Sequence, residues 1–365
     1  MYKKADSILL GIVGFLLLGG IFTLASASLG LLLESGGSVA RIVGKQIAYG
    51  FGIGGALFAV TSSVRYRYWQ KIALPFFLFT LGISFLVFVP HIGFSAGGAS
   101  RWIVLGPIFF QPSELLKFGL VVYLASWMAV RQKAITTFRS GLLPFVVLLA
   151  AVGAVFVLQP DIGTLSVVII TAIALFFIGG GRLRQLALLV LLGFIFFGLL
   201  SVLEPYRISR IVTFFNPSAD VQGAGYHIRQ ALIALGSGGL WGRGFGMGRQ
   251  KFDYLPEPTG DSIFAVLGEE FGFVGSAILI IGFLAFAVRG LAVSRQAPDN
   301  FGRLLGSGLV ILIITQSFMN IAAMTSLVPL TGLPLIFISQ GGSALAVALA
   351  QVGILVSISK QRARM

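Results

Sequence analysis

The chain has 365 residues, of which 57% are hydrophobic and 10% are charged, and its mean hydropathy is +0.98. These values exclude an ordinary soluble domain and indicate a polytopic membrane protein. The net charge of +14 includes no long basic run, so it does not indicate nucleic-acid binding. Because the sequence contains no Cys, disulfides and cysteine-based metal sites are excluded.

Ten apolar runs approach the roughly 20 residues that a helix needs to cross a bilayer. They lie at 7–33, 46–64, 72–89, 115–130, 142–158, 164–178, 185–203, 262–288, 304–324 and 343–359. The first follows a basic flank and contains Ala25-Ser-Ala27, as a signal peptide could, but its length favours an uncleaved span. We therefore predict an all-α membrane protein, one polytopic domain over 1–365 with about ten transmembrane helices.

The loops between these runs differ in charge. Sixteen of the 26 Lys and Arg residues lie in one set of short loops and in both termini: Lys3, Lys4, Arg65, Arg67, Lys71, Arg131, Lys133, Arg139, Arg182, Arg184, Arg289, Arg295, Arg303, Lys360, Arg362 and Arg364. The positive-inside rule makes this side cytoplasmic, which places both termini in the cytoplasm. The opposite side holds most of the acidic residues and one long external loop, 204–261, before the eighth span. We expect that loop to be ordered and partly interfacial.

A polar, proline-containing segment leads straight into the eighth apolar run, and Asp261 stands at the junction. An ionisable group at the mouth of a membrane segment is a candidate functional residue, because burying a charge there is costly. Asp261, followed by Ser262, could also cap the helix, and the two roles are compatible. Glu269 and Glu270, about two turns further on, are predicted to form structural hydrogen bonds to neighbouring helices.

A second external block, at 97–117, ends in Gln-Pro-Ser-Glu-Leu-Leu-Lys. Glu114 and Lys117 are three residues apart, so they share one helical face and can pair. They either neutralise each other at a helix end or face a water-filled cavity and position a polar substrate. Asp161, in the turn Gln-Pro-Asp-Ile-Gly, is predicted to cap the helix that follows.

The long external loop carries dispersed cations, which either contact lipid headgroups or together hold a pyrophosphate. They are Arg207, Arg210, Arg229, Arg243, Arg249 and Lys251. The glycine-rich segment 236–248 follows no strand, which excludes a dinucleotide or P-loop site. His91 and His227 are isolated in the sequence, so we expect no histidine-based metal site.

Three blocks of this sequence resemble the SEDS family, which includes FtsW and RodA. The first block is Arg-Gln-Lys-Phe-Asp-Tyr-Leu-Pro-Glu-Pro, together with Asp261 and the helix after it. The second begins at Arg101-Trp-Ile and ends at Lys117. The third is the segment 329–343, which contains Thr-Gly-Leu-Pro and Gly-Gly-Ser. The spelling of the first block is closer to the FtsW branch. Many relatives carry His-Thr before the aspartate, whereas this chain has Thr259-Gly260, so no histidine is expected to assist there. The third block is also longer than usual at 335–338.

The resemblance implies a peptidoglycan glycosyltransferase that polymerises lipid II on the outer face of the cytoplasmic, or inner, membrane. Its implied partners are a class B penicillin-binding protein as transpeptidase, other division or elongation proteins, and membrane lipids. Asp261 becomes the general base on the acceptor sugar hydroxyl, in an inverting transfer that releases undecaprenyl pyrophosphate. Glu114 and Lys117 line the cavity that faces this aspartate.

Arg101, Arg210 and Lys251 complete the set of substrate-binding candidates, and Arg210 matches the family's Arg-hydrophobic-Phe-x-x-Pro segment. Arg, Lys or a divalent cation such as Mg²⁺ or Mn²⁺ would stabilise the leaving pyrophosphate. Membrane spans that contain charges would equally suit a lipid II flippase or transporter. A third reading is a non-catalytic activator of a penicillin-binding protein.

Overall fold

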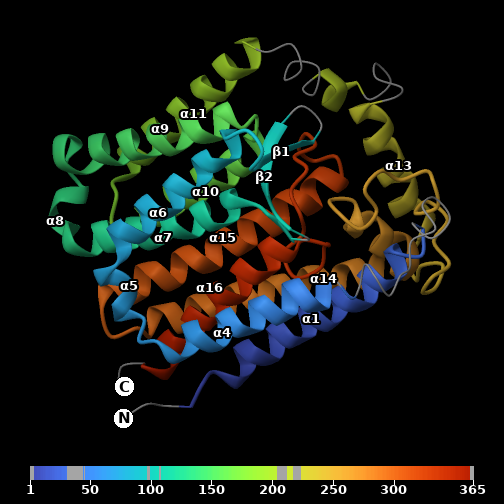
Figure 1. Ribbon diagram of the computed structural model, residues 1–365, viewed down its shortest axis with the longest axis horizontal. Coiled ribbons are helices and arrows are strands. Elements are labelled where there is room, and N and C mark those ends of the chain that lie inside the picture. The colour runs from blue at the N-terminus through green and yellow to red at the C-terminus, as the bar shows by residue number, and fades with distance from the viewer. Residues whose placement is uncertain are drawn as a thin grey trace.

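The computed structural model describes residues 4–30, 44, 46–96, 99–106, 108–203, 212–216 and 223–361. Within these ranges the chain is a bundle of long helices, with a small sheet and several loops at the end away from both termini (Figure 1). The helices are α1 (Ser7–Ala27), η1 (Gln46–Ile53), α4 (Gly54–Ser63), α5 (Arg67–Lys71), α6 (Ala73–Phe85), η2 (Leu86–Phe88), α7 (Pro112–Val130), α8 (Gln132–Ile135), η3 (Phe138–Leu142), α9 (Leu143–Leu158), α10 (Ile162–Ile178), α11 (Leu183–Leu203), α13 (Ala224–Ser237), α14 (Ile263–Arg295), α15 (Asn300–Met324) and α16 (Gly342–Lys360).

Each of the ten predicted apolar runs is helical over most of its described length. Helices are expected here because hydrocarbon offers no hydrogen-bond partners, so each segment must pair its own backbone groups. Among the described residues, six segments are long and apolar enough to cross a membrane: α1, α7, η3 with α9, α14, α15 and α16. Three shorter apolar helices, 73–88, 162–178 and 183–199, accompany them. The helical membrane fold is confirmed, while the count of ten spans stays a prediction.

The centre of the bundle is formed by α15 and α16, which are buried along most of their length. Small residues allow the close approach of α16 to α4, as is common where helices pack in lipid. A Cβ atom at Gly353 would lie 2.0 Å from Oγ1 of Thr61, and that hydroxyl donates to the carbonyl of Ala350 at 2.9 Å. The C-terminal helix is therefore held against the N-terminal part of the chain.

A three-stranded antiparallel sheet precedes α7. The all-α prediction did not include this sheet. Its strands are β1 (Gly93–Ala96), β2 (Ala99–Leu105) and β3 (Ile108–Phe110). Trp102 pairs with Phe94, and Ile103 pairs with both Gly93 and Phe110. Aromatic and β-branched residues favour strands, which explains why this external segment is extended.

The helix α14 is interrupted at Gly272, where φ is 64° and ψ is −161°. The glycine-rich loop wraps around this break. Amides of residues 243 and 244 donate to the carbonyls of residues 269 and 270 at 3.0 Å, and amides of 273 and 274 donate to the carbonyls of 239 and 240. These bonds satisfy backbone groups that the break leaves without helical partners. The eighth predicted span is therefore two helical segments that meet at Gly272.

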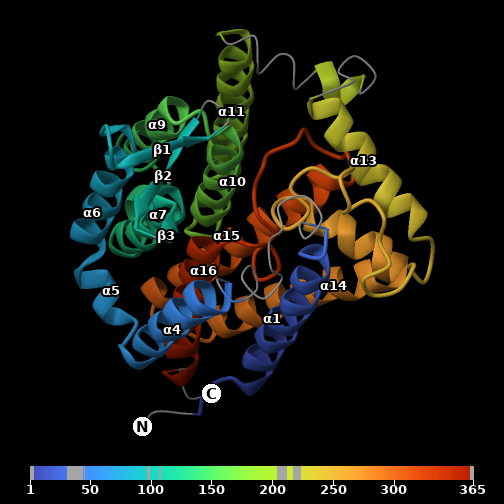
Figure 2. The same ribbon diagram turned by 45° about the vertical axis from the view of Figure 1, so that its right-hand side comes forward.

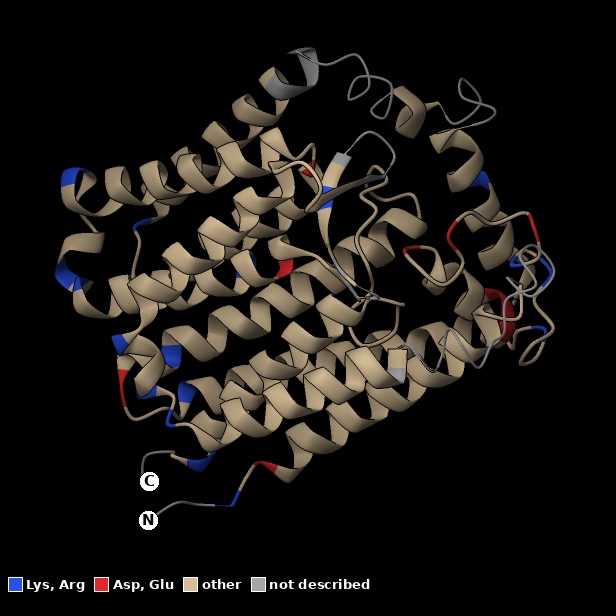
Figure 3. Ribbon diagram, viewed as in Figure 1, with Lys and Arg blue, Asp and Glu red and all other residues tan. Residues whose placement is uncertain are grey.

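Charge is distributed unevenly between the two ends of the bundle (Figure 3). Lys and Arg gather at the end that carries both termini. Two of these cations are paired, Arg67 with Asp299 and Arg289 with Asp6. The opposite end carries most of the other acidic residues and the cations of the loop after α13. This separation follows the loop charges from which the orientation was predicted.

Candidate active site

Asp261 lies in the turn that immediately precedes α14, and its side chain is 15% exposed. The capping position of α14 belongs to Ser262, and no side chain caps the helix there. The prediction that Asp261 also caps this helix is therefore wrong, because the helix begins one residue later than such a cap requires. The carboxylate lies beside Gly332, where an added Cβ would be 3.9 Å from Oδ2.

His227, from α13, reaches the same place. Its Nε2 atom lies 3.9 Å from Oδ1 of Asp261 and 2.6 Å from Oγ of Ser262. The expectation that no histidine assists the aspartate was therefore incomplete, because it considered only the residues next to Asp261 in the chain. Helical spacing carried a signal, since His227 shares one face with the buried Ala231 and Ala234.

Glu114 and Lys117 form a buried ion pair at the start of α7. Nζ of Lys117 donates to Oε1 of Glu114 at 2.8 Å, and the two side chains are 4% exposed or less. Lys117 also donates to Oε1 of Gln316 on α15. The predicted pairing on one helical face is thus confirmed, and it extends to a second helix.

The side-chain amides of Gln316 and Asn320, one turn apart on α15, connect this pair to the segment of Asp261. Gln316 donates to the carbonyl of Pro334 at 3.4 Å, and Asn320 donates to the carbonyls of Leu333 and Asp261, both at 2.7 Å. The turn at 331–334 therefore lies between the ion pair and the aspartate. Figure 2 shows the loop after α15 between α10 and α13.

The third block is also joined to the other two. The backbone amide of Gln340 donates to the backbone carbonyl of Thr259 at 2.8 Å, two residues before Asp261 in the chain. Oγ of Ser343 donates to the carbonyl of Phe109 at 3.0 Å and accepts from the amide of Gln111 at 3.2 Å. Three blocks that are far apart in the sequence thus meet around the start of α14.

The predicted cationic residues have different surroundings. Lys251 is buried, and its ammonium donates to Glu270 at 2.6 Å and to two oxygens of Ser26, so all three of its N–H bonds are used. Arg101 donates to the carbonyls of the turn before α10, at Pro160 and Gln159. Arg210 lies outside the described residues. Their roles in substrate binding stay predictions.

Asp161 and Glu270 have the structural roles that were predicted for them, whereas Glu269 bonds to the loop before the site and not to a neighbouring helix. Asp161 caps α10, since it accepts from the amide of Thr164 at 3.2 Å. Glu269 accepts from the amides of residues 249 and 250 at 2.8 and 3.1 Å, and Glu270 accepts from Ser26 on α1 at 2.6 Å. The two glutamates therefore fix the loop before Asp261 to the bundle.

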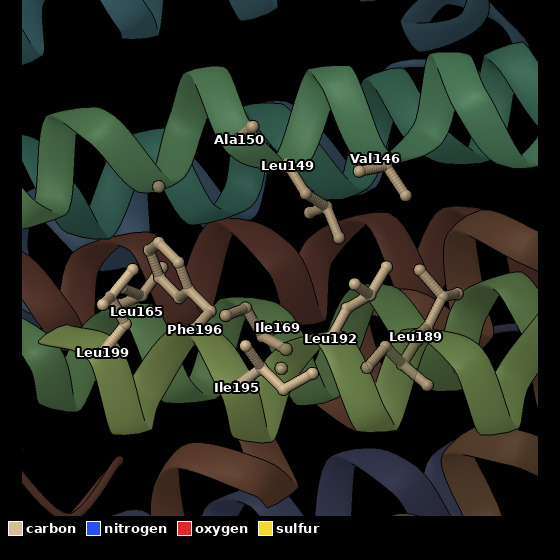
Figure 4. Close-up of a pocket in the computed structure, with 13 residues that line it drawn as sticks. Val146, Leu149, Ala150, Leu165, Ile169, Leu189, Leu192, Ile195, Phe196 and Leu199 are labelled. Carbon is tan, nitrogen blue, oxygen red and sulfur yellow. The ribbon is translucent and has the colours of Figure 1, made fainter.

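A cavity of about 330 Å³ lies between α9, α10 and α11 (Figure 4). The side chains that line it are apolar and include Leu149, Ile169 and Phe196. No lining side chain could act as an acid, a base or a nucleophile, so this cavity is separate from the chemistry around Asp261. The described residues also hold no group of three His, Asp or Glu side chains arranged to bind a metal.

Comparison with known proteins identifies the family. Residues 7–364 match the family model FTSW_RODA_SPOVE, described as cell cycle protein. Stage V sporulation protein E of Bacillus subtilis (strain 168) is 39% identical over 295 residues, which cover 81% of this chain and 80% of that protein. A probable peptidoglycan glycosyltransferase FtsW of Geobacter sulfurreducens (strain DL-1 / KN400) is 41% identical over 310 residues, covering 85% of this chain and 82% of the relative.

Solved structures agree with this result over the full length of the chain. A chain from work on the structural coordination of polymerization and crosslinking by a peptidoglycan synthase complex has a TM-score of 0.79 and 25% identity, with 99% of each chain covered. The rod shape determining protein RodA of Thermus thermophilus has a TM-score of 0.71 and 27% identity, covering 99% of this chain and 98% of that chain. The chain therefore belongs to the FtsW/RodA/SpoVE family, the SEDS proteins, and its relatives favour the FtsW branch.

Proposed function

We propose that this chain is a peptidoglycan glycosyltransferase that polymerises lipid II. Family membership and the names of its relatives support the reaction class. The observation that carries the assignment to this site is the meeting of the three sequence blocks around the turn that carries Asp261. A partly exposed carboxylate at a junction of helices can be reached by a sugar hydroxyl and can accept its proton.

In the proposed reaction, Asp261 removes the proton from the acceptor sugar hydroxyl. The hydroxyl oxygen forms a bond to the anomeric carbon of the donor from the face opposite the leaving group, so the configuration inverts. The carbon–oxygen bond to the diphosphate breaks, and its electron pair leaves with undecaprenyl pyrophosphate. The acceptor proton remains on the Asp261 carboxyl, and cationic groups stabilise the departing diphosphate.

The cationic groups proposed for the substrate are Lys117, Arg101 and Arg210, and Glu114 would position Lys117. The hydrogen bond from Lys117 to Gln316 supports this part of the proposal, because Gln316 and Asn320 connect the ion pair to the segment of Asp261. Lys251 has a different proposed role. Its buried bonds to Glu270 and Ser26 would hold the loop that carries the site.

We further propose about ten spans in the inner membrane, with both termini cytoplasmic and Asp261 on the external side. The distribution of Lys and Arg toward the end with the termini supports this orientation. A class B penicillin-binding protein is the proposed partner, and the similarity to a chain from a peptidoglycan synthase complex supports it. Lipid II is the proposed substrate.

Reconstitution with lipid II tests this function. The protein, purified in detergent with its penicillin-binding partner, is expected to form glycan chains. Polymerisation does not require a membrane that separates two compartments, whereas transport does. A protein that forms no chains in detergent, yet moves lipid II across vesicle membranes, would overturn the proposal in favour of transport. If the partner forms the same chains without this protein, the partner is the polymerase and the proposal is wrong.

A further inference from the structure

The contacts of His227 define which of its ring nitrogens carries hydrogen. Oγ of Ser262 donates to the carbonyl of Pro256 at 2.6 Å, and a serine hydroxyl has one hydrogen to give. The same oxygen lies 2.6 Å from Nε2 of His227, so Nε2 must be the donor in that contact. His227 therefore carries a hydrogen on Nε2 in its neutral form as well as in its charged form.

This nitrogen is also the one that approaches Asp261, at 3.9 Å from Oδ1. A polarised N–H group at this distance favours the ionised form of a carboxylate. The side chains of His227 and Asp261 are 14% and 15% exposed, so solvent screens the interaction only partly. Packing of α13 against α14 fixes the ring in place, as the two helices in Figure 2 lie side by side.

Other groups around the ring are less suited to this role. On α13 itself, the guanidinium of Arg229 donates to the carbonyl of Gly225 at 3.3 Å. The loop before α14 carries Glu257, whose exposed side chain lies over Gly260. From α15, Asn320 contributes an uncharged amide to the backbone of Asp261. The carboxylate of Asp261 lies at ion-pair distance from the ring, 3.9 Å from Nε2.

We propose that His227 is a positioning residue for Asp261: its Nε2–H group, held by Ser262, lies 3.9 Å from Oδ1, and the positive end of this dipole favours the ionised carboxylate. The inference rests on the proposed function, in which Asp261 accepts the proton of the acceptor hydroxyl. The imidazole touches no substrate and exchanges no atom with it.

The test is the pH dependence of glycan chain formation from lipid II. For His227→Ala we expect a loss of turnover of roughly threefold to tenfold, because a through-space interaction at 3.9 Å is weaker than a direct hydrogen bond, with little change in the KM for lipid II. The acid limb of the profile should move to higher pH, because the carboxylate then binds a proton more readily. His227→Gln retains an N–H donor and should recover most of both properties. His91→Asn, which changes the other histidine in an exposed turn, should behave as the wild type.

Two results would overturn the proposal. One is a His227→Ala protein with the wild-type turnover and acid limb. The other is a loss of turnover with an unmoved acid limb that His227→Gln does not recover, which would make the ring a packing element. Asp261→Asn is measured alongside as a test of the base itself. If Asp261→Asn still forms chains at the normal rate, the assignment of the base is wrong. If Asp261→Asn is inactive but His227→Ala is unaffected, only the role of the histidine is wrong.

Discussion

Lys117 and Lys251 are both buried, and each lies within 2.8 Å of a glutamate carboxylate. A buried charge is tolerated when it is paired and its hydrogen-bonding groups are satisfied. The two lysines nevertheless differ in their surroundings. Lys251 is surrounded by oxygens of α1 and α14, whereas Lys117 contacts Gln316, whose amide continues toward the turn beside Asp261. Lys117 is therefore the better candidate for the substrate.

Replacement of the ion pair at the start of α7 separates stability from function. Lys117→Met leaves Glu114 buried without its counter-ion, which should lower the free energy of unfolding by about 3–5 kcal/mol. The double variant Glu114→Leu with Lys117→Met should recover most of that loss, as thermal unfolding in detergent would show. If the pair positions the substrate, the recovered double variant stays inactive; full activity in it would contradict that role.

Tyr66 precedes α5 at the end of the bundle near the termini. Burial, together with its hydrogen bond to Asp299 at 2.8 Å, raises the pKa of Tyr66 from 10.0 to about 12. Because the folded protein holds this proton more tightly, its contribution to stability is complete below pH 10.0 and is lost as the pH rises toward 12.

We therefore expect the stability difference between the wild type and Tyr66→Phe to be constant below pH 10.0 and to shrink between 10.0 and about 12. Thermal unfolding in detergent across this range measures it. Tyr68→Phe, at an exposed neighbouring position, is the control and should show no such dependence. A difference that grows with pH would contradict the assigned direction.

The element that shapes the site is α14 with its break at Gly272. The loop before the site folds around this break, and Glu269 and Glu270 at the end of the first helical segment bind the loop at residues 249–251. The short segment from Ile263 to the break therefore has its position set by the loop on one side and by α15 on the other. This arrangement fixes the position of Asp261 in the turn that leads into α14.

Gly272→Ala tests the importance of the break. Its backbone conformation is one that residues with a Cβ rarely adopt, at a cost of about 1–3 kcal/mol, and an added Cβ would lie 2.3 Å from the amide nitrogen of Gly242. We expect a lower unfolding temperature and reduced chain formation. Gly11→Ala in α1 has nothing within 4 Å of its added Cβ and should be neutral or slightly stabilising. Equal effects of the two changes would contradict the account.

The elements differ in how far the sequence predicted them. Hydropathy located the helices because each apolar run must form its own backbone hydrogen bonds in lipid. The sheet was missed because β1 and β3 are short, with 4 and 3 residues, and lie beside turn residues. The break at Gly272 was missed because glycines in apolar runs also occur in continuous membrane helices. The contact of His227 with Asp261 depends on how α13 packs against α14, which local sequence does not specify.

On the scale of the whole molecule, the charges near the termini also join distant parts of the chain. Asp6 pairs with Arg289 on α14 at 2.7 Å, and the amide of Asp6 donates to Ser359 on α16 at 3.1 Å. The ends of the first, eighth and last apolar runs thus meet at one end of the bundle. The three sequence blocks meet at the other end, which separates the proposed cytoplasmic face from the proposed active site.

Cysteine labelling can test this orientation directly, because the native chain contains no Cys. Gln132→Cys lies in α8, between two basic residues, and Met247→Cys lies in the exposed loop before the site. In intact cells, a membrane-impermeant maleimide should label Met247→Cys at once and Gln132→Cys only after the membrane is permeabilised. The reverse pattern would place Asp261 in the cytoplasm and contradict the proposed reaction.

The most direct measurement is the rate of glycan chain formation from lipid II by Asp261→Asn in detergent with the partner present. Asparagine keeps the size of the side chain but cannot serve as the general base. We predict a loss of at least about a hundredfold with an unchanged unfolding temperature and unchanged lipid II binding. A folded Asp261→Asn protein that forms chains within twofold of the wild-type rate would contradict it.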